Sequence, residues 1–127
     1  MKSVVRIANG AGFLGDSITA PRRLVEGASV DYLTIEHLAE LTMSILARQR
    51  EKDPQAGYAE DFVEIVSSLA SALRTQPQLK VIANSGGMNP LACAAAVAKV
   101  LAAAQLTDVP IGVVTGDDLL PHLDSVL

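Results

Sequence analysis

Short apolar runs alternate with longer amphipathic segments along this chain. The short runs are rich in β-branched residues, and each is followed by polar residues or glycine: 3–8, 30–35, 79–83 and 109–115. Runs of this kind predict strands that are buried on both faces of a sheet. Between the runs, apolar residues recur every three or four positions. This spacing predicts four helices, over 19–27, 38–52, 58–75 and 90–104.

Local signals mark the ends of several predicted helices. Pro21 suits the first turn of helix 19–27, because a proline there gives up an amide that has no partner in the helix. Asn89 followed by Pro90 is typical of an N-cap and first helical position. The segment 53–57, which contains proline and glycine, predicts a break between two helices.

Strands that alternate with helices indicate a parallel sheet joined by right-handed βαβ crossovers. We therefore expect a single α/β domain over residues 1–127, with a small parallel sheet of about four strands. Helices on its faces would give a three-layer arrangement that is flavodoxin-like or Rossmann-like. Because a sheet of this size has open edges and can leave a face uncovered, we also expect a homo-oligomer or a partner subunit.

Composition and charge exclude several classes of function. The net charge is −4, basic residues are scattered and aromatic residues make up only 3%, which argues against binding to nucleic acid. The lone cysteine, Cys93, excludes an internal disulfide and fits a reducing cytosol. No signal peptide and no apolar run long enough to cross a bilayer are visible. We expect a cytoplasmic protein that does not bind membranes.

A glycine-rich loop follows the first predicted strand. Gly10, Gly12 and Gly15 match the G-x-G-x-x-G pattern of dinucleotide folds, and Glu36 lies where such folds place an acid for the ribose. However, Asp16 would repel a phosphate, and Pro21 would interrupt a helix that began at the glycines. Two further readings remain: the glycines shape a turn, or the loop holds a polar ligand of another kind.

Small polar or acidic residues follow all four predicted strands. In a parallel sheet, ligands bind beyond the carboxyl ends of the strands, so we expect these residues to converge on one small-molecule site. The predicted catalytic residues are Asp16, Glu36 and Asp117. The predicted substrate-binding residues are Asn9, Gly10, Gly12, Gly15, Ser17, Asn84, Ser85, Gly86, Gly87, Asn89, Thr115 and Gly116.

Individual roles within this site stay open. Glu36 would act as a base or hydroxyl acceptor and His37 as a proton carrier, or both would simply open the long helix. Asp16, Glu36 and Asp117 could share a divalent cation, but no spacing is specific for a metal and we assign no metal ligand. Ser85 lacks a nucleophile-elbow motif, although its amide could help to hold an anion. No cofactor can be identified.

Several motifs together resemble the amino-terminal part of the acyclic terpene utilisation (AtuA-like) family. They occur in the family's order and cover nearly the whole chain. They are Asn9-Gly10-Ala11-Gly12-Phe13-Leu14-Gly15-Asp16-Ser17, Asn84-Ser85-Gly86-Gly87-Met88-Asn89-Pro90 and Gly116-Asp117-Asp118-Leu119, with further similarity over 31–33, 38–48 and 58–62. The end of strand two, Thr34-Ile35-Glu36-His37, departs from the family, which more often has small residues and an acid there.

The resemblance implies a bacterial-type cytoplasmic protein of acyclic terpenoid catabolism, with metabolites such as citronellol and geraniol. Family members are usually several times longer, so a partner subunit would supply the missing part of the domain unless the chain is a fragment. We therefore expect an enzyme, or part of one, that acts on a small oxygenated or acyl-CoA metabolite. The alternative is a noncatalytic nucleotide- or metabolite-binding module, or a subunit of a larger complex.

Overall fold

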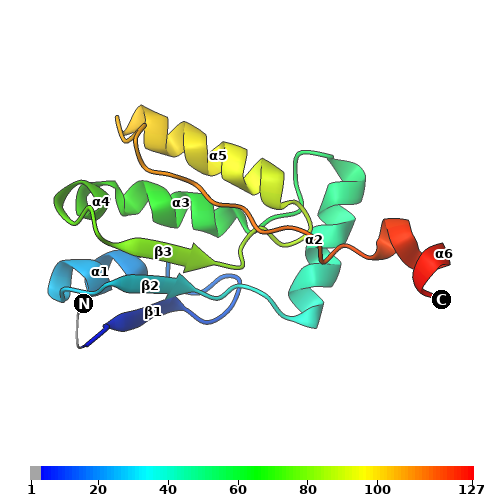
Figure 1. Ribbon diagram of the computed structural model, residues 1–127, viewed down its shortest axis with the longest axis horizontal. Helices are drawn as coiled ribbons and strands as arrows, with labels where there is room; N and C mark the ends of the chain where they lie inside the picture. The colour runs from blue at the N-terminus through cyan, green and yellow to red at the C-terminus, as the bar shows by residue number, and fades with distance from the viewer. Residues whose placement is uncertain (1–3) are drawn as a thin grey trace.

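A three-stranded parallel sheet lies at the centre of the computed structural model, which describes residues 4–127. The strands β1 (Ile7–Ala11), β2 (Tyr32–Ile35) and β3 (Lys80–Ala83) follow the order β1-β2-β3, and both pairings are parallel (Figure 1). Helix α1 (Ala20–Gly27) connects the first two strands. The parallel α/β class is confirmed, with one strand fewer than expected.

The remaining helices lie close to their predicted positions. Between β2 and β3 the chain forms α2 (Glu40–Lys52), α3 (Glu60–Ser68) and α4 (Ala70–Thr75). Helix α5 (Pro90–Ala103) follows β3, and the Asn89 side chain caps it by accepting the amide of Ala92 at 3.4 Å, as predicted. A short 3₁₀ turn, η1 (Leu120–His122), and helix α6 (Leu123–Val126) end the chain.

The predicted helix 58–75 is divided at Leu69. The Leu69 amide is shared between the carbonyls of Ile65 at 3.0 Å and Val66 at 3.1 Å, which tightens the turn. The Ser68 hydroxyl also donates to the Ile65 carbonyl at 2.7 Å. Such a side-chain hydrogen bond to the backbone competes with the regular helical hydrogen bonds. The segment therefore forms two consecutive helices, α3 and α4.

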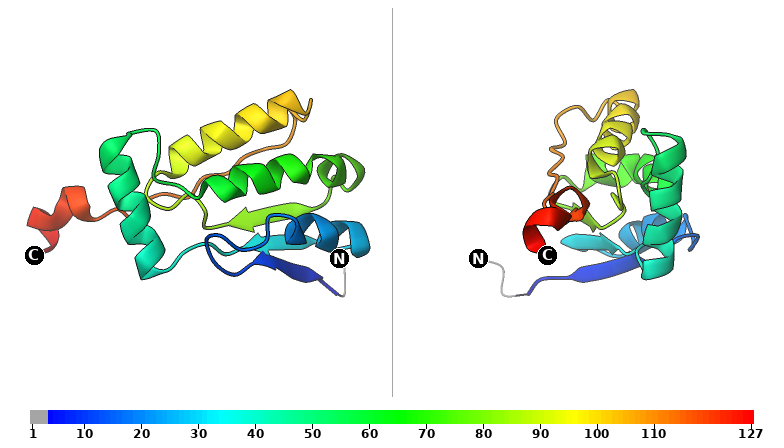
Figure 2. Two further views of the ribbon diagram at one scale, coloured as in Figure 1. Left: turned by 180° about the vertical axis from the view of Figure 1, so that it is seen from behind. Right: turned by 90° about the vertical axis from the view of Figure 1, so that its right-hand side faces the viewer.

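One face of the sheet forms the main core. The chain steps across the sheet twice in the same direction, so two crossovers of one hand place their helices on the same side. In the left-hand view of Figure 2, which shows the molecule from behind, α1 lies in front of the strands. On this side Leu33 and Ile35 of β2 pack with Val25 of α1, with Ile65 of α3 and with Leu69 between α3 and α4. Helix α5 packs on α3 in a second cluster, which includes the buried Cys93.

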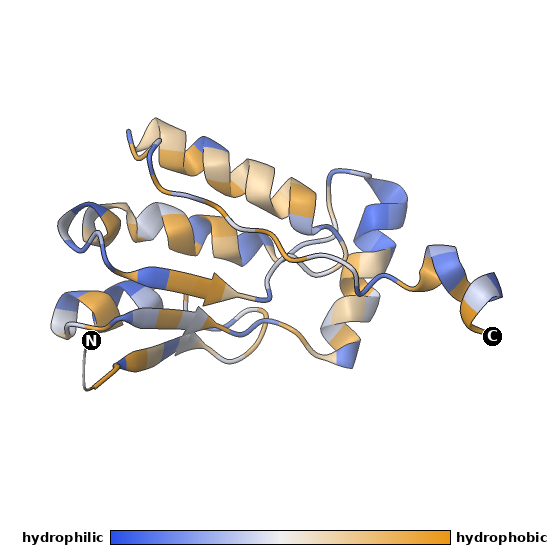
Figure 3. Cartoon of the chain, viewed as in Figure 1, coloured by the Kyte–Doolittle hydropathy of each residue, from blue (hydrophilic) through white to orange (hydrophobic). Residues whose placement is uncertain are grey.

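The opposite face of the sheet is open. Ile7 is 67% exposed and Ile82 is 54% exposed on this face. Asn9, Thr34 and Ile82 occupy one register row across the three strands. Figure 3 shows hydrophobic residues along β1 and β3. The expectation of helices on the sheet faces therefore holds for one face within residues 4–127.

The predicted fourth strand, 109–115, is absent from the described sheet. The segment is extended and lies on the β3 side of the sheet (Figures 1 and 2), but within residues 4–127 no backbone hydrogen bond joins it to β3. Pro110 has no amide to donate, and Gly112 offers no side chain to pack. The β-branched composition of this run was therefore not sufficient to form a strand.

No helix within residues 4–127 is both long enough and apolar enough to cross a membrane.

Candidate functional site

Two carboxylates, one from the loop and one from α3, bind backbone amides of the glycine-rich loop. Asp16 accepts the amide of Gly12 at 2.9 Å and that of Ser17 at 2.7 Å, and Asp61 of α3 accepts the amide of Gly15 at 3.0 Å. The two backbone hydrogen bonds lower the pKa of Asp16, which keeps its carboxylate ionised. The amides of Gly12, Gly15 and Ser17 are therefore not available to a phosphate, and α1 begins only at Ala20. This geometry does not fit a dinucleotide loop.

Two glycines of this loop have structural roles. Gly10 is buried at a β-bulge, where an added Cβ would lie 3.0 Å from both Ile35 and Pro21. Gly15 has a φ of +90°, a left-handed conformation that other residues rarely adopt. Both glycines are therefore required by the backbone conformation of the loop. Their contact with substrate stays a prediction.

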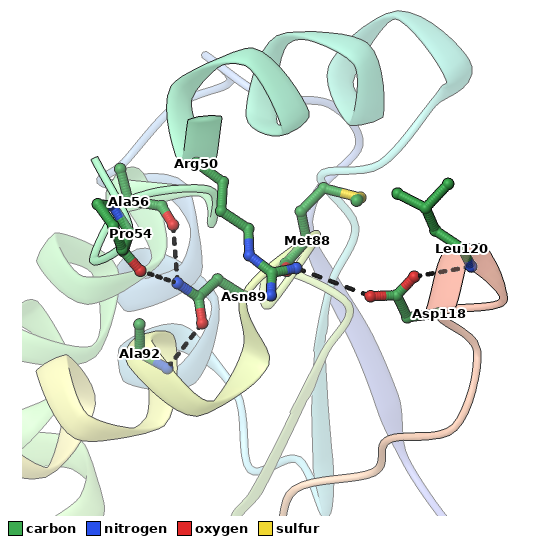
Figure 4. A network of polar contacts seen from close by, with 8 residues as sticks. All are labelled: Arg50, Pro54, Ala56, Met88, Asn89, Ala92, Asp118 and Leu120. Carbon is green, nitrogen blue, oxygen red and sulfur yellow. Dashed lines mark hydrogen bonds and ion pairs between the residues drawn. The ribbon is translucent and has the colours of Figure 1, made fainter. Parts of the chain in front are cut away.

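The loop after β3 is fixed by tight packing around its glycines. An added Cβ at Gly86 would lie 2.8 Å from Pro90, and one at Gly87 would meet the side chain of Leu46 in α2. The Asn89 amide donates to the carbonyls of Pro54 at 2.9 Å and Ala56 at 2.8 Å (Figure 4). These residues therefore join α2, the 53–57 break and α5.

The last predicted site segment, 115–118, is linked to the loop after β3 through Arg50. The Arg50 guanidinium donates to the Met88 carbonyl at 2.6 Å and lies 3.8 Å from the Asp118 carboxylate (Figure 4). Thr115, Gly116 and Asp117 are exposed beside this contact. The structure thus places 115–118 near the loop after β3, and the catalytic role of Asp117 stays a prediction.

A polar network connects the ends of β2 and β3. The Asn84 amide donates to Glu36 Oε1 at 2.6 Å, and Asn84 Oδ1 accepts the backbone amide of His37 at 2.9 Å. The Leu38 amide also donates to Glu36 Oε1, at 2.8 Å. Beneath them His37 Nδ1 lies 2.9 Å from Ser85 Oγ, and both side chains are buried.

The network sets the charge of its two titratable groups. The hydrogen bonds from Asn84 and Leu38 lower the pKa of Glu36, so it is an exposed carboxylate at neutral pH. Burial lowers the pKa of His37, against the opposing influence of Asp61, Glu36 and Asp16. His37 is therefore neutral near pH 7, and its hydrogen bond to Ser85 joins two uncharged groups.

Next to this network lies an open depression of about 320 Å³ on the uncovered side of the sheet. Its polar lining comes from Asn9 and Thr34, within β1 and β2, and from Glu36 and Asn84, which directly follow β2 and β3. Its apolar lining comes from β2 and β3. The lining residues are Asn9, Thr34, Ile35, Glu36, Ile82, Ala83 and Asn84. The depression can hold a small ligand with a polar group at one end and an apolar body.

Two of the alternatives left open by the sequence can now be decided. Helix α2 begins at Glu40, so Glu36 and His37 do not open it. Within the described part of the chain, no group of three or more His, Cys, Asp and Glu residues is arranged to hold a metal ion. The carboxylates of Asp16, Glu36 and Asp117 therefore do not form a shared cation site.

Sequence reasoning missed several residues around the depression. Thr34, Ile82 and Ala83 line it, and Asp61 closes the glycine loop from α3. Thr34 could have been noticed, since it is a polar residue within an apolar strand and alternates with the buried Leu33 and Ile35. For Asp61 no local signal exists, because its contact spans 46 positions.

Fold and site together define a parallel α/β protein with a candidate ligand site at the carboxyl ends of its strands. Residues 5–127 match the family described as acyclic terpene utilisation family protein AtuA, and the chain belongs to that family. Comparison with curated proteins and with solved structures found no match. The resemblance drawn from the sequence motifs is thus confirmed.

Proposed function

We propose that this chain binds a small oxygenated or acyl metabolite of acyclic terpenoid breakdown, as an enzyme or as the amino-terminal part of one. The observation that carries the proposal is the depression itself, in which Asn9, Glu36 and Asn84 meet beside Ile82. A terpenoid metabolite combines a polar group with an apolar chain, and this lining offers a complement to both. Membership of the acyclic terpene utilisation family supports the same class of ligand.

Among the predicted catalytic residues, Glu36 is the best placed to act on such a ligand. Its carboxylate is ionised, lines the depression and is oriented by Asn84. The oxygens of Asp16, in contrast, are engaged with the amides of Gly12 and Ser17. We therefore assign Glu36 the role of hydrogen-bond acceptor or base, and Asp16 the role of holding the glycine loop.

A thermal-shift panel tests this proposal. Acyl-CoA thioesters, short terpenoid alcohols and aldehydes, NAD(P) and ATP would each be added to the protein and to two variants. A true ligand at a hundredfold excess over its Kd should raise the Tm by about 5 °C or more. Glu36→Gln should reduce the shift. Glu64→Gln, the same change at an exposed position of α3, should leave it unchanged.

Mass spectrometry of the stabilising compound after incubation separates an enzyme from a binding module. New products would support catalysis, whereas tight binding without chemical change would support the noncatalytic alternative. A shift that is equal in the wild type and Glu36→Gln would place the ligand elsewhere and contradict the site.

A second candidate role is that of a subunit in a homo-oligomer or a larger complex. Ile7 and Ile82 on the open sheet face, together with Val114 and Leu120 near the end of the chain, are more than half exposed. Exposed apolar surface of this kind marks association sites in many proteins. Sedimentation velocity across a range of concentrations tests this role, and a monomer at all concentrations would contradict self-association.

A further inference from the structure

The polar end of the depression offers one charged acceptor. Asn84 and Leu38 both donate to Oε1 of Glu36, and within residues 4–127 the second oxygen, Oε2, accepts no hydrogen bond. The carboxylate is exposed and its pKa is lowered. Glu36 Oε2 is therefore a fixed, negatively charged acceptor that a bound ligand can use.

The same end also offers a neutral donor. The Thr34 hydroxyl donates to Asn9 Oδ1 at 2.9 Å, and it lies 3.3 Å from the Ala8 carbonyl. Because Asn9 Oδ1 accepts this hydrogen bond, the side-chain amide NH2 group of Asn9 remains available as a donor. Within the described residues it has no protein partner. Asn9 on β1 and Glu36 directly after β2 line the same depression.

The apolar part of the lining continues from this pair onto β2 and β3. Ile82 occupies the same register row as Asn9 and Thr34, and Ala83 follows it. Ile82 is 54% exposed, so an alkyl group placed on it would remove apolar surface from water. A ligand that fits is therefore amphiphilic and short, with its head at Glu36 and Asn9.

We propose that Glu36 makes this site selective for an uncharged hydroxyl head over the corresponding carboxylate. The inference rests on the proposed function and narrows its ligand class. A hydroxyl has both a proton to donate to Glu36 Oε2 and lone pairs that can accept from Asn9. A carboxylate has no proton to donate near pH 7, and its charge opposes that of Glu36. An ammonium group can donate to Glu36 but cannot accept from Asn9.

A thioester is disfavoured for a related reason. Its carbonyl can accept from Asn9, but it has no hydrogen to offer Glu36, whose second oxygen would lose water without compensation. Of the metabolite classes considered above, the site thus favours oxygenated compounds over acyl-CoA compounds. Glu36 is the specificity-determining residue, and Asn84 acts through it as a positioning residue.

The test compares 1-octanol with octanoate, which have the same chain length and differ in the charge of the head. Each is titrated into ¹⁵N-labelled protein at pH 7.5, and the amides of Thr34, Glu36, Ile82 and Asn84 are followed by NMR. In the wild type, octanol should shift these amides at lower concentrations than octanoate does. In Glu36→Gln, octanoate should bind roughly fivefold more tightly, as expected when one unit charge about 4 Å away is removed in a water-like medium.

Glu64→Gln is the matched control, because it removes the same charge from an exposed site on α3 and should leave both titrations unchanged. If octanoate shifts the four amides of the wild type as strongly as octanol does, the selectivity is overturned while the proposed binding site stands. If neither probe nor any compound of the thermal-shift panel moves them, both proposals fail.

Discussion

The two faces of the sheet are built from the same three strands and differ in every physical respect. On the covered face Leu33, Ile35 and Ala11 lie against helices and are almost fully buried. On the open face Ile7, Asn9 and Ile82 meet solvent. Because side chains alternate along a strand, neighbouring residues of a strand face the core and the open side in turn. Ile35 belongs to the core and also lines the depression. Ile7 and Ile82 on the open face thus belong to neither of the two hydrophobic core clusters within residues 4–127.

The largest expected effect separates the faces directly. Leu33→Ala should lower the free energy of unfolding by about 2–5 kcal/mol, since it leaves a cavity in the core. Ile82→Ala should cost less than about 1 kcal/mol, because Ile82 is already 54% exposed. Urea denaturation measures both. Equal losses would show that the open face is covered in solution, which would favour the oligomer or partner subunit.

A smaller effect on the free energy of unfolding is expected when the pH is lowered. The pKa of His37 is lowered in the folded protein, so the unfolded chain binds a proton more readily. The stabilisation is then complete above the ordinary histidine value of 6.5 and is lost as the pH falls through the folded value. The urea midpoint should therefore drop on acidification below about pH 6.5.

The variant His37→Asn removes this titration. Its urea midpoint should be lower at neutral pH, because the buried contact with Ser85 is lost, but its dependence on pH between 7 and 5 should be flatter. An unchanged slope would assign the acid sensitivity to other groups. His122 is exposed in η1, so His122→Asn is the control and should keep the wild-type slope.

The smallest effect concerns the charge of the open depression. Asn84→Ala removes the hydrogen bond that contributes most to the lowered pKa of Glu36, so this pKa should rise while the Leu38 contact persists. Carbon-detected NMR of the glutamate carboxyl groups measures the change. The pKa of Asp16, held by Gly12 and Ser17, provides an internal reference and should not move. No rise at Glu36 would remove Asn84 as its positioning residue.

Local patterns were sufficient for much of the fold. The alternation of apolar runs and amphipathic segments predicted three of the strands and the helices, but it set the first strand at 3–8, whereas β1 spans Ile7–Ala11. Asn89-Pro90 predicted the start of α5. These features depend on neighbouring residues, through periodicity, capping and the fixed φ of proline. The family resemblance was also visible in short motifs, and the match over residues 5–127 confirmed it.

Only the tertiary structure decided which polar residues meet and which residues stay exposed. The hydrogen bonds between Asn84 and Glu36 and between Gly15 and Asp61 span 48 and 46 positions, and no local pattern encodes them. The failure of 109–115 to join the sheet is also a tertiary outcome, because a strand forms only where a neighbour accepts its hydrogen bonds. The sequence by itself determined the elements and their order. Long-range packing then determined that helices cover one face of the sheet, and that residues of the other face stay exposed.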